Sequence, residues 1–218
     1  MGKRERAREL VKSGERKRES GDFAGAETDL QEARRLYETL GDSRALAHVW
    51  GHLGLNSQLQ GNLGEASERF GQGLLCALKA GDRGTVAIAL RHLGKIWTLK
   101  VPDRDLGIFL LRASVLGAPG SRAHRVWFRH GLVGGYFRNG QTLKAFWQLL
   151  LSLLDLGLGW REEPDTLKKR VWLTGALLDL GRLPLVGAVF SQITLSLATR
   201  WSLEVRRQEA LRALGRDS

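Results

Sequence analysis

The feature that most constrains the fold of this chain is that its sequence repeats itself about every forty residues. The segment GDFAGAETDLQEARRLYETLGDSRALAHVWGHLG begins at Gly21, and GNLGEASERFGQGLLCALKAGDRGTVAIALRHLG begins at Gly61. The shift aligns large residues with large ones, such as Leu30 with Phe70. A period of this length is typical of one supersecondary unit stacked on its own copies. The chain is therefore expected to be a tandem array.

Each repeat is expected to form two amphipathic helices. Apolar residues recur three and four positions apart, as at Leu30, Ala33 and Tyr37, and this period indicates a helix with one buried face. The Gly-Asp pairs that begin at Gly41 and Gly81 suit the turns between helices. Glycine can close one helix in the left-handed conformation, and aspartate can cap the next. No segment shows the alternation expected of a strand.

These patterns predict an all-α chain of about five helical hairpins and a C-terminal capping helix, forming one domain over residues 1–218. The hairpins are expected near residues 4–40, 43–80, 83–116, 121–157 and 164–198, and the capping helix near 201–214. The first helices of the hairpins should lie near 4–19, 43–59, 83–99, 121–138 and 164–180. Their second helices should lie near 22–40, 62–80, 103–116, 141–157 and 182–198.

The second repeat carries a pattern that resembles the tetratricopeptide repeat (TPR) signature: Trp50, Leu53, Gly54, Gly61, Ala66 and Phe70. The forty-residue period is longer than the common thirty-four. It resembles the long-repeat variety found in adaptor proteins and some bacterial regulators. The resemblance implies an α–α superhelix in which Gly54 and Ala66 lie where the two helices of a hairpin cross. It leaves Gly51 and Gly64 without a role.

The resemblance also implies where a partner binds, because the first helices of stacked TPR hairpins line a concave groove. Carried over position by position, the residues facing this groove are mostly basic or neutral: Arg8, Lys12, His48, His52, Gln58, Arg91, His92, Lys95 and Arg138. An acidic peptide or partner segment would suit such a groove. The expected function is a non-enzymatic scaffold for protein–protein interaction in a regulatory or assembly complex.

The charge distribution supports an alternative function. The net charge is +11, and residues 106–154 contain no aspartate or glutamate. Within that segment Arg122, Arg125 and Arg129 recur at three- and four-residue spacing, which would place them in one stripe on a helix. Arginines beside aromatic residues can bind phosphates and stack on bases, so the chain could bind nucleic acid or regulate a nucleic-acid enzyme. In the simpler interpretation the aromatic residues are core and the arginines form a solvated face.

No pattern predicts a catalytic residue, a metal site or a cofactor. His48 and His52 have the spacing of paired metal ligands, but no cysteine or carboxylate completes a recognisable set. The single cysteine, Cys76, excludes an internal disulfide and fits a reducing compartment such as the cytoplasm. The most apolar run, residues 145–160, is shorter than the roughly 20 residues of a membrane span, so it is interpreted as a buried helix.

Overall fold

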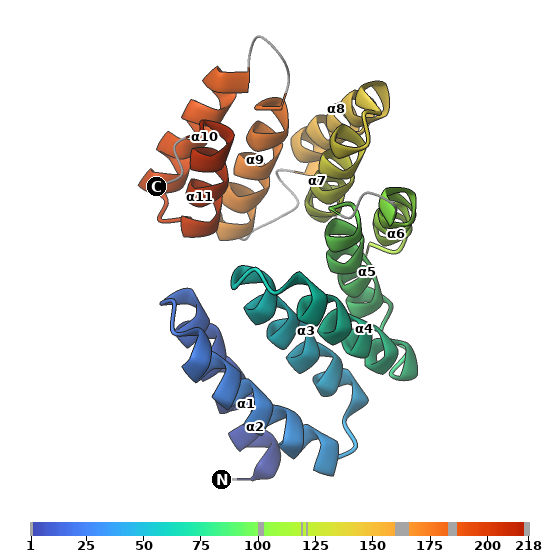
Figure 1. Ribbon diagram of the computed structural model, residues 1–218, viewed down its shortest axis with the longest axis vertical. Coiled ribbons are helices and arrows are strands. Elements are labelled where there is room, and N and C mark those ends of the chain that lie inside the picture. Colours follow the sequence, from blue (N-terminus) through green and yellow to red (C-terminus); the bar gives the residue numbers. More distant parts are fainter. Residues whose placement is uncertain are drawn as a thin grey trace. The chain divides into compact units, whose positions relative to one another are not determined.

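The computed structural model describes residues 2–99, 103–118, 120, 122–159, 166–182 and 187–215, with the side chains of 122–124, 159, 166–168, 172 and 204–205 excepted. Within these ranges the chain is helical and contains no strand (Figure 1). The helices are α1 (Lys3–Glu19), α2 (Phe23–Thr39), α3 (Ser43–Leu59), α4 (Leu63–Lys79), α5 (Arg83–Trp97), α6 (Arg104–Leu116), α7 (Arg122–Arg138), α8 (Thr142–Gly159), α9 (Thr166–Leu180), α10 (Gly187–Arg200) and α11 (Glu204–Ala213).

These bounds confirm the predicted all-α repeat. Most differ by only a few residues from those expected from the sequence. The predicted helix residues 121, 164–165 and 183–186 lie outside the described ranges. Local signals explain the agreement, because the turns carry the expected residues. Gly41 and Gly81 both have a φ of 64°. Asp42 then accepts a hydrogen bond from the backbone N–H of Ala45 at 3.0 Å, and Asp82 accepts one from Thr85 at 3.1 Å.

The chain forms two compact units, Met1–Ile96 and Trp97–Ser218. In the first unit α1 packs on α2, α2 on α3 and α3 on α4. In the second unit α7 packs against α6, α8 and α9, and α9, α10 and α11 pack on one another. The single superhelical domain over residues 1–218 stays a prediction.

Within the hairpins of the first unit, the helices approach closely at glycines. A Cβ atom added to Gly54 would lie 2.7 Å from Cδ1 and Cε1 of Phe70, which is closer than real Cβ atoms come to other atoms. In the first hairpin a Cβ on Gly14 would lie 2.8 Å from Cγ of Leu30. Ala66 is fully buried, as its predicted place at a helix crossing requires. The side chain that fills the space beside Gly54 is the ring of Phe70.

The interpretation of residues 145–160 as a buried helix is wrong. One face of α8 is buried, with Ala145 and Leu149 at 0% and 1% exposure. On the other face, Phe146 and Trp147 are 50% and 58% exposed. An apolar run shows that a helix can be buried all round, but it does not show that a neighbour covers every face.

A buried polar network joins α7, α9 and α11 in the second unit. Arg206 Nη1 lies 3.2 Å from His130 Nε2, and His130 Nδ1 lies 2.9 Å from Asp179 Oδ2. Because arginine can only donate, Nε2 accepts and the Nδ1–H group donates to Asp179. Burial raises the pKa of Asp179 to about 7, against the opposite effect of Arg182 and Arg206. These contacts attach the last described helix to the core of its unit.

The crossing at Gly54 predicts opposite effects for two glycine substitutions. Gly54→Ala should lower the free energy of unfolding by about 1–3 kcal/mol, because the new methyl group overlaps the ring of Phe70. Gly71→Ala should leave stability unchanged or raise it by up to about 1 kcal/mol, because a Cβ on Gly71 meets nothing within 4 Å and alanine favours the helix. Urea denaturation of both variants measures the difference. Equal effects at the two positions would contradict the proposed crossing.

Candidate functional site: a pocket in the first unit

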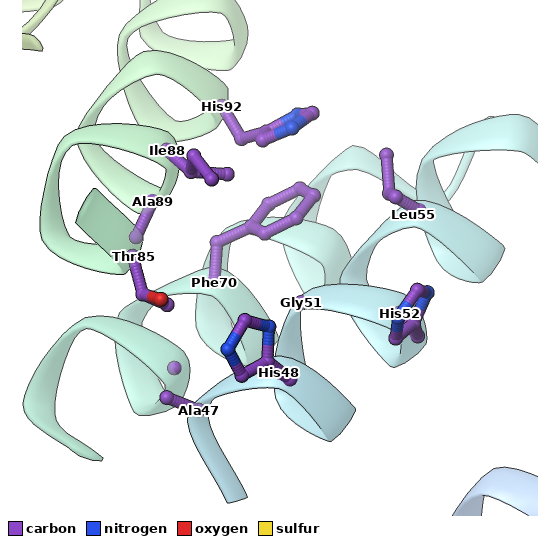
Figure 2. A pocket seen from close by; sticks show the side chains of 11 residues that line it. Ala47, His48, Gly51, His52, Leu55, Phe70, Thr85, Ile88, Ala89 and His92 are labelled. Carbon is purple, nitrogen blue, oxygen red and sulfur yellow. The ribbon is translucent and has the colours of Figure 1, made fainter. Parts of the chain in front are cut away.

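A pocket of about 180 Å³ opens between α3 and α5, with α4 contributing the residues between them (Figure 2). Both outer helices present residues at positions i, i+3, i+4 and i+7, which lie on one face of a helix. The lining residues are His48, Gly51, His52 and Leu55 with Ala47 from α3, Phe70 and Gly73 from α4, and Thr85, Ile88, Ala89 and His92 from α5. The lining is mostly apolar, with the polar atoms supplied mainly by imidazoles.

The Phe70 ring stacks on the His92 imidazole, with the ring centroids 4.6 Å apart and the planes 14° from parallel. In Figure 2 the Phe70 ring lies between Ile88 of α5 and Leu55 of α3, with the His92 imidazole above it in this view. Burial lowers the pKa of His92 well below its ordinary value, and the neighbouring charges of Arg91 and Lys95 lower it further. His92 is therefore neutral near pH 7 and acts as a flat, weakly polar wall of the pocket.

His52 is held on the other side of the pocket by two residues of α1. Arg18 Nη1 lies 3.3 Å from His52 Nδ1, and His52 Nε2 lies 3.1 Å from Glu15 Oε1. Since arginine only donates, Nδ1 accepts and the Nε2–H group donates to Glu15. Burial lowers the pKa of His52 to about 4, with smaller effects from Arg18 and His48. The imidazole is neutral near pH 7, and its contacts connect α1 to α3.

The predicted groove residues are only partly brought together. The three histidines of that set line the pocket. Arg8 and Lys12 are exposed on α1, and Lys12 Nζ lies 3.0 Å from Glu9 Oε1. Gln58 and Lys95 are half-buried. Arg91 differs from expectation because it is only 3% exposed and offers no surface cation to a ligand.

Arg138, the remaining residue of the predicted groove, belongs to the second unit. Its Nη2 donates a hydrogen bond to Thr98 Oγ1 at 2.8 Å. Burial lowers the pKa of Arg138 to about 10, and the nearby charges of Arg182 and Arg104 act in the same direction. Arg138 therefore has a structural contact within its own unit, and a groove shared with the histidines of the first unit stays a prediction.

Two of the three arginines in the predicted basic stripe form ion pairs with the carboxylate of Asp155. Arg129 Nη1 lies 3.1 Å from Asp155 Oδ2, and Arg125 Nη2 lies 3.5 Å from Asp155 Oδ1. The side chain of Arg122 lies outside the described part of the chain. Asp155 follows directly after the acid-free segment, so the segment is acid-free in sequence while its arginines have an acidic neighbour in space.

Two aromatic residues of α7, Phe128 and Tyr136, are core residues, and Trp127 and Phe137 pack partly buried against the core. Phe128 and Tyr136 are 0% and 6% exposed, and Trp127 packs edge-on against Phe128 with ring centroids 4.9 Å apart. Stacking of nucleic-acid bases requires accessible ring faces. Phe128 and Tyr136 therefore do not offer ring faces on which bases could stack. This agrees with the simpler interpretation, in which these residues are core.

Sequence reasoning missed much of the pocket wall. The residues Gly51, Thr85, Ile88 and Ala89 were not assigned to it, although the last three recur with His92 at i, i+3, i+4 and i+7. That spacing is the signal that could have found them. Gly51 shares the same spacing with His48 and His52, but a glycine has no side chain, so its role shows only when the space in front of it is known.

The described residues contain no group of three or more His, Cys, Asp or Glu side chains that could hold a metal ion. None of their helices is long and apolar enough to cross a membrane.

The fold is that of TPR-like repeat proteins. Two solved structures of kinesin light chain-like repeats from Podosopora anserina, one of them a single-substitution variant, match with a TM-score of 0.61 and 16% identity. The variant matches over 93% of this chain and 99% of its own length, and the other structure over 97% of this chain and 98% of its own length. The Rap conjugation gene regulator of plasmid pLS20, in complex with the Phr* peptide, matches with a TM-score of 0.62 and 15% identity.

That match covers 99% of this chain, which spans 64% of the regulator. No protein-family model and no curated protein sequence matches the chain. At these identities the likeness concerns the fold, so the class shown is a TPR-like helical repeat protein.

The low pKa of His52 predicts a specific pH dependence of stability. Between pH 6.5 and about 4 the unfolded chain binds a proton at this imidazole that the folded chain does not, so stability falls as the pH falls through this range. In His52→Gln the difference in unfolding free energy between pH 7 and pH 5 should be smaller than in the wild type. Urea denaturation at both pH values measures it. An unchanged difference would contradict a neutral, partly buried His52.

The contact between Arg129 and Asp155 predicts that this arginine stabilises the fold. Asp155 is 8% exposed, so removing Arg129, the nearer of its two cations, leaves a buried carboxylate with only the more distant Arg125. Arg129→Ala should therefore lower the free energy of unfolding by about 1–3 kcal/mol. Arg112→Ala, at an exposed position in the same acid-free segment, serves as the control and should change stability by less than about 0.5 kcal/mol. Similar losses for both variants would show that the ion pair is not the cause.

Proposed function

We propose that this protein is a non-enzymatic scaffold that binds an extended segment of a partner protein along α1, α3 and α5 of the first unit. The observation that carries this proposal is the pocket between α3 and α5. Contacts between α1 and α3 at His52 place a third helix beside it. The Rap regulator, which has a similar fold, was solved with a bound peptide, and this supports a peptide as the ligand here.

The pocket favours a large apolar side chain at one position of that peptide. Its volume is about 180 Å³, and an apolar cavity of about 150 Å³ is large enough to bind benzene. The walls include Phe70, Ile88 and Leu55. Two of the imidazoles in the lining, those of His52 and His92, are neutral. A charged side chain would lose its hydration there without gaining an ionic partner, which is unfavourable. A leucine or phenylalanine side chain would remove apolar surface from water, which is favourable.

Acidic residues elsewhere in the peptide suit the charge of the protein. The net charge is +11, and α1 carries exposed cations such as Arg8 and Lys12. Such charges act mainly on the rate of encounter and on the choice of partner. We place the acidic positions outside the pocket, because its walls are mostly apolar. A role in a regulatory or assembly complex in the cytoplasm fits a scaffold of this kind and a single cysteine.

The alternative, a nucleic-acid-binding protein that uses residues 106–154, has less support. Phosphate binding by Arg125 and Arg129 would have to compete with their ion pairs to Asp155. A positive net charge produces weak, salt-sensitive binding to nucleic acid in any case. We therefore rank this alternative below the peptide-binding scaffold.

Filling the pocket should abolish peptide binding without unfolding the protein. A Cβ on Gly51 meets nothing within 4 Å, so Gly51→Leu extends into open space from a helix that tolerates leucine well. We expect a displayed library of short random peptides to yield wild-type binders that share one large apolar residue near acidic ones. Gly51→Leu should bind them at least about tenfold more weakly, which corresponds to 1.4 kcal/mol.

The matched control is Gly71→Leu, which also adds a leucine in open space within a helix but does not line the pocket. It should bind the selected peptides as the wild type does. Equal binding by wild type and Gly51→Leu would contradict the pocket as the binding site. Selection of peptides without any shared apolar position would contradict the proposed ligand.

A further inference from the structure

The outer face of α8 carries an exposed apolar stripe. It runs along the helix at spacings of mostly three and four residues, and its members are Leu143 (84% exposed), Phe146 (50%), Trp147 (58%), Leu150 (47%), Leu153 (38%), Leu154 (57%) and Leu158 (52%). Taking about 150–200 Å² for each side chain, the lower part of the range for large apolar residues, these fractions correspond to roughly 600–800 Å² of apolar surface. That reaches or exceeds the largest patch of a typical monomer, about 300–600 Å².

The repeat fold does not require this stripe, because the other hairpins show what the same positions carry elsewhere. The buried positions of α8 match those of α2 and α4: Ala145 corresponds to Ala26 and Ala66, and Leu149 to Leu30 and Phe70. In the same register, Phe146 corresponds to Glu27 and Ser67, Trp147 to Thr28 and Glu68, and Leu150 to Gln31 and Gly71. The first two hairpins fold with polar residues or glycine where the fourth has large apolar side chains.

The stripe also has a shape that can receive another side chain. A hollow of about 370 Å³ lies beside its first half, lined by Tyr136 of α7 and by Leu143, Phe146 and Trp147 of α8, with Lys144 and Gln148. Lys144 is the one exposed charged residue among the described side chains of α8. The middle of the stripe therefore presents only apolar surface to a partner.

From this stripe we infer that a second copy of the chain docks on α8, with the two α8 helices antiparallel around a two-fold axis near Leu150. A two-fold interface needs a self-complementary surface, and an uncharged stripe centred near Leu150 provides one. The hollow beside Trp147 then receives Leu154 of the other copy. The area per copy is close to the ~800 Å² that each partner contributes to a standard interface.

The antiparallel arrangement also keeps the two Lys144 side chains apart, which limits the repulsion between two positively charged copies. In this arrangement Lys144 of one copy lies opposite the far end of the stripe on the other copy. With a rise of 1.5 Å per residue the two Lys144 residues are about 20 Å apart along the axis. That exceeds the Debye length of about 8 Å at physiological salt, so their repulsion is largely screened. A parallel pair would place the two ammonium groups side by side.

The first experiment measures the mass in solution by sedimentation equilibrium, at loading concentrations from about 1 to 100 µM. The wild type should change from the 24.2 kDa monomer toward twice that mass as its concentration rises. The triple variant Phe146→Ser, Trp147→Glu, Leu150→Gln should stay a monomer and keep its helical circular dichroism, because α2 and α4 carry those residues at the same positions. The control variant Leu75→Gln, Leu78→Gln removes two exposed leucines of α4 and should dimerise as the wild type does.

A second experiment tests the orientation and does not depend on the folding of the triple variant. In a Cys76→Ala background, Leu150→Cys should cross-link to its counterpart with a short bis-maleimide, because that residue lies at the axis. Leu143→Cys should not cross-link, because its counterpart is about 20 Å away in the antiparallel pair. A wild type that stays monomeric throughout, a triple variant that still dimerises, or equal cross-linking at both positions would overturn the proposal.

Discussion

The close approach of two helices at a glycine is the interaction on which the first unit depends. Because Gly54 has no side chain, the ring of Phe70 lies directly against α3. The same ring stacks on His92 of α5. One aromatic side chain thus joins the two helices of its own hairpin and the first helix of the next. The spacing of α3 and α5, and with it the width of the pocket between them, follows from that contact.

The physical reason for a glycine differs among the glycine positions of α3 and of the turns that flank it. Gly41 and Gly61 need the left-handed conformation, and Gly54 needs the space that a side chain would take. Gly51 needs neither, since its φ is helical and a Cβ would meet nothing within 4 Å. A glycine at such a position costs the helix about 1 kcal/mol relative to alanine and gains no packing in return. Sites where local rules are broken without a structural gain are expected where function uses the space, and Gly51 lines the pocket.

The sequence predicted the hairpins well because their determinants are local. A helical period, a left-handed glycine and an aspartate cap act within a few residues, so their positions in the chain are enough to locate α2, α3 and α4. The burial of Arg91, the ion pairs of Asp155 and the neutral state of His52 depend on contacts between residues distant in sequence. A repeat period specifies the order of the hairpins but not the side chains that meet between them. For that reason the three histidines of the predicted groove line one pocket, while Arg91 of the same set is buried.

Because the chain is a repeat, equivalent positions in different hairpins can be compared with one another. Positions that pack inside a hairpin stay apolar in the first, second and fourth copies, as Leu30, Phe70 and Leu149 show. Positions on the solvent side are free to vary, since they cost the fold little. When the fourth hairpin carries Trp147 where the first two carry Thr28 and Glu68, the fold cannot be the reason for the tryptophan. An exposed apolar residue at a position that the fold leaves free is therefore best explained by a surface that another protein chain covers.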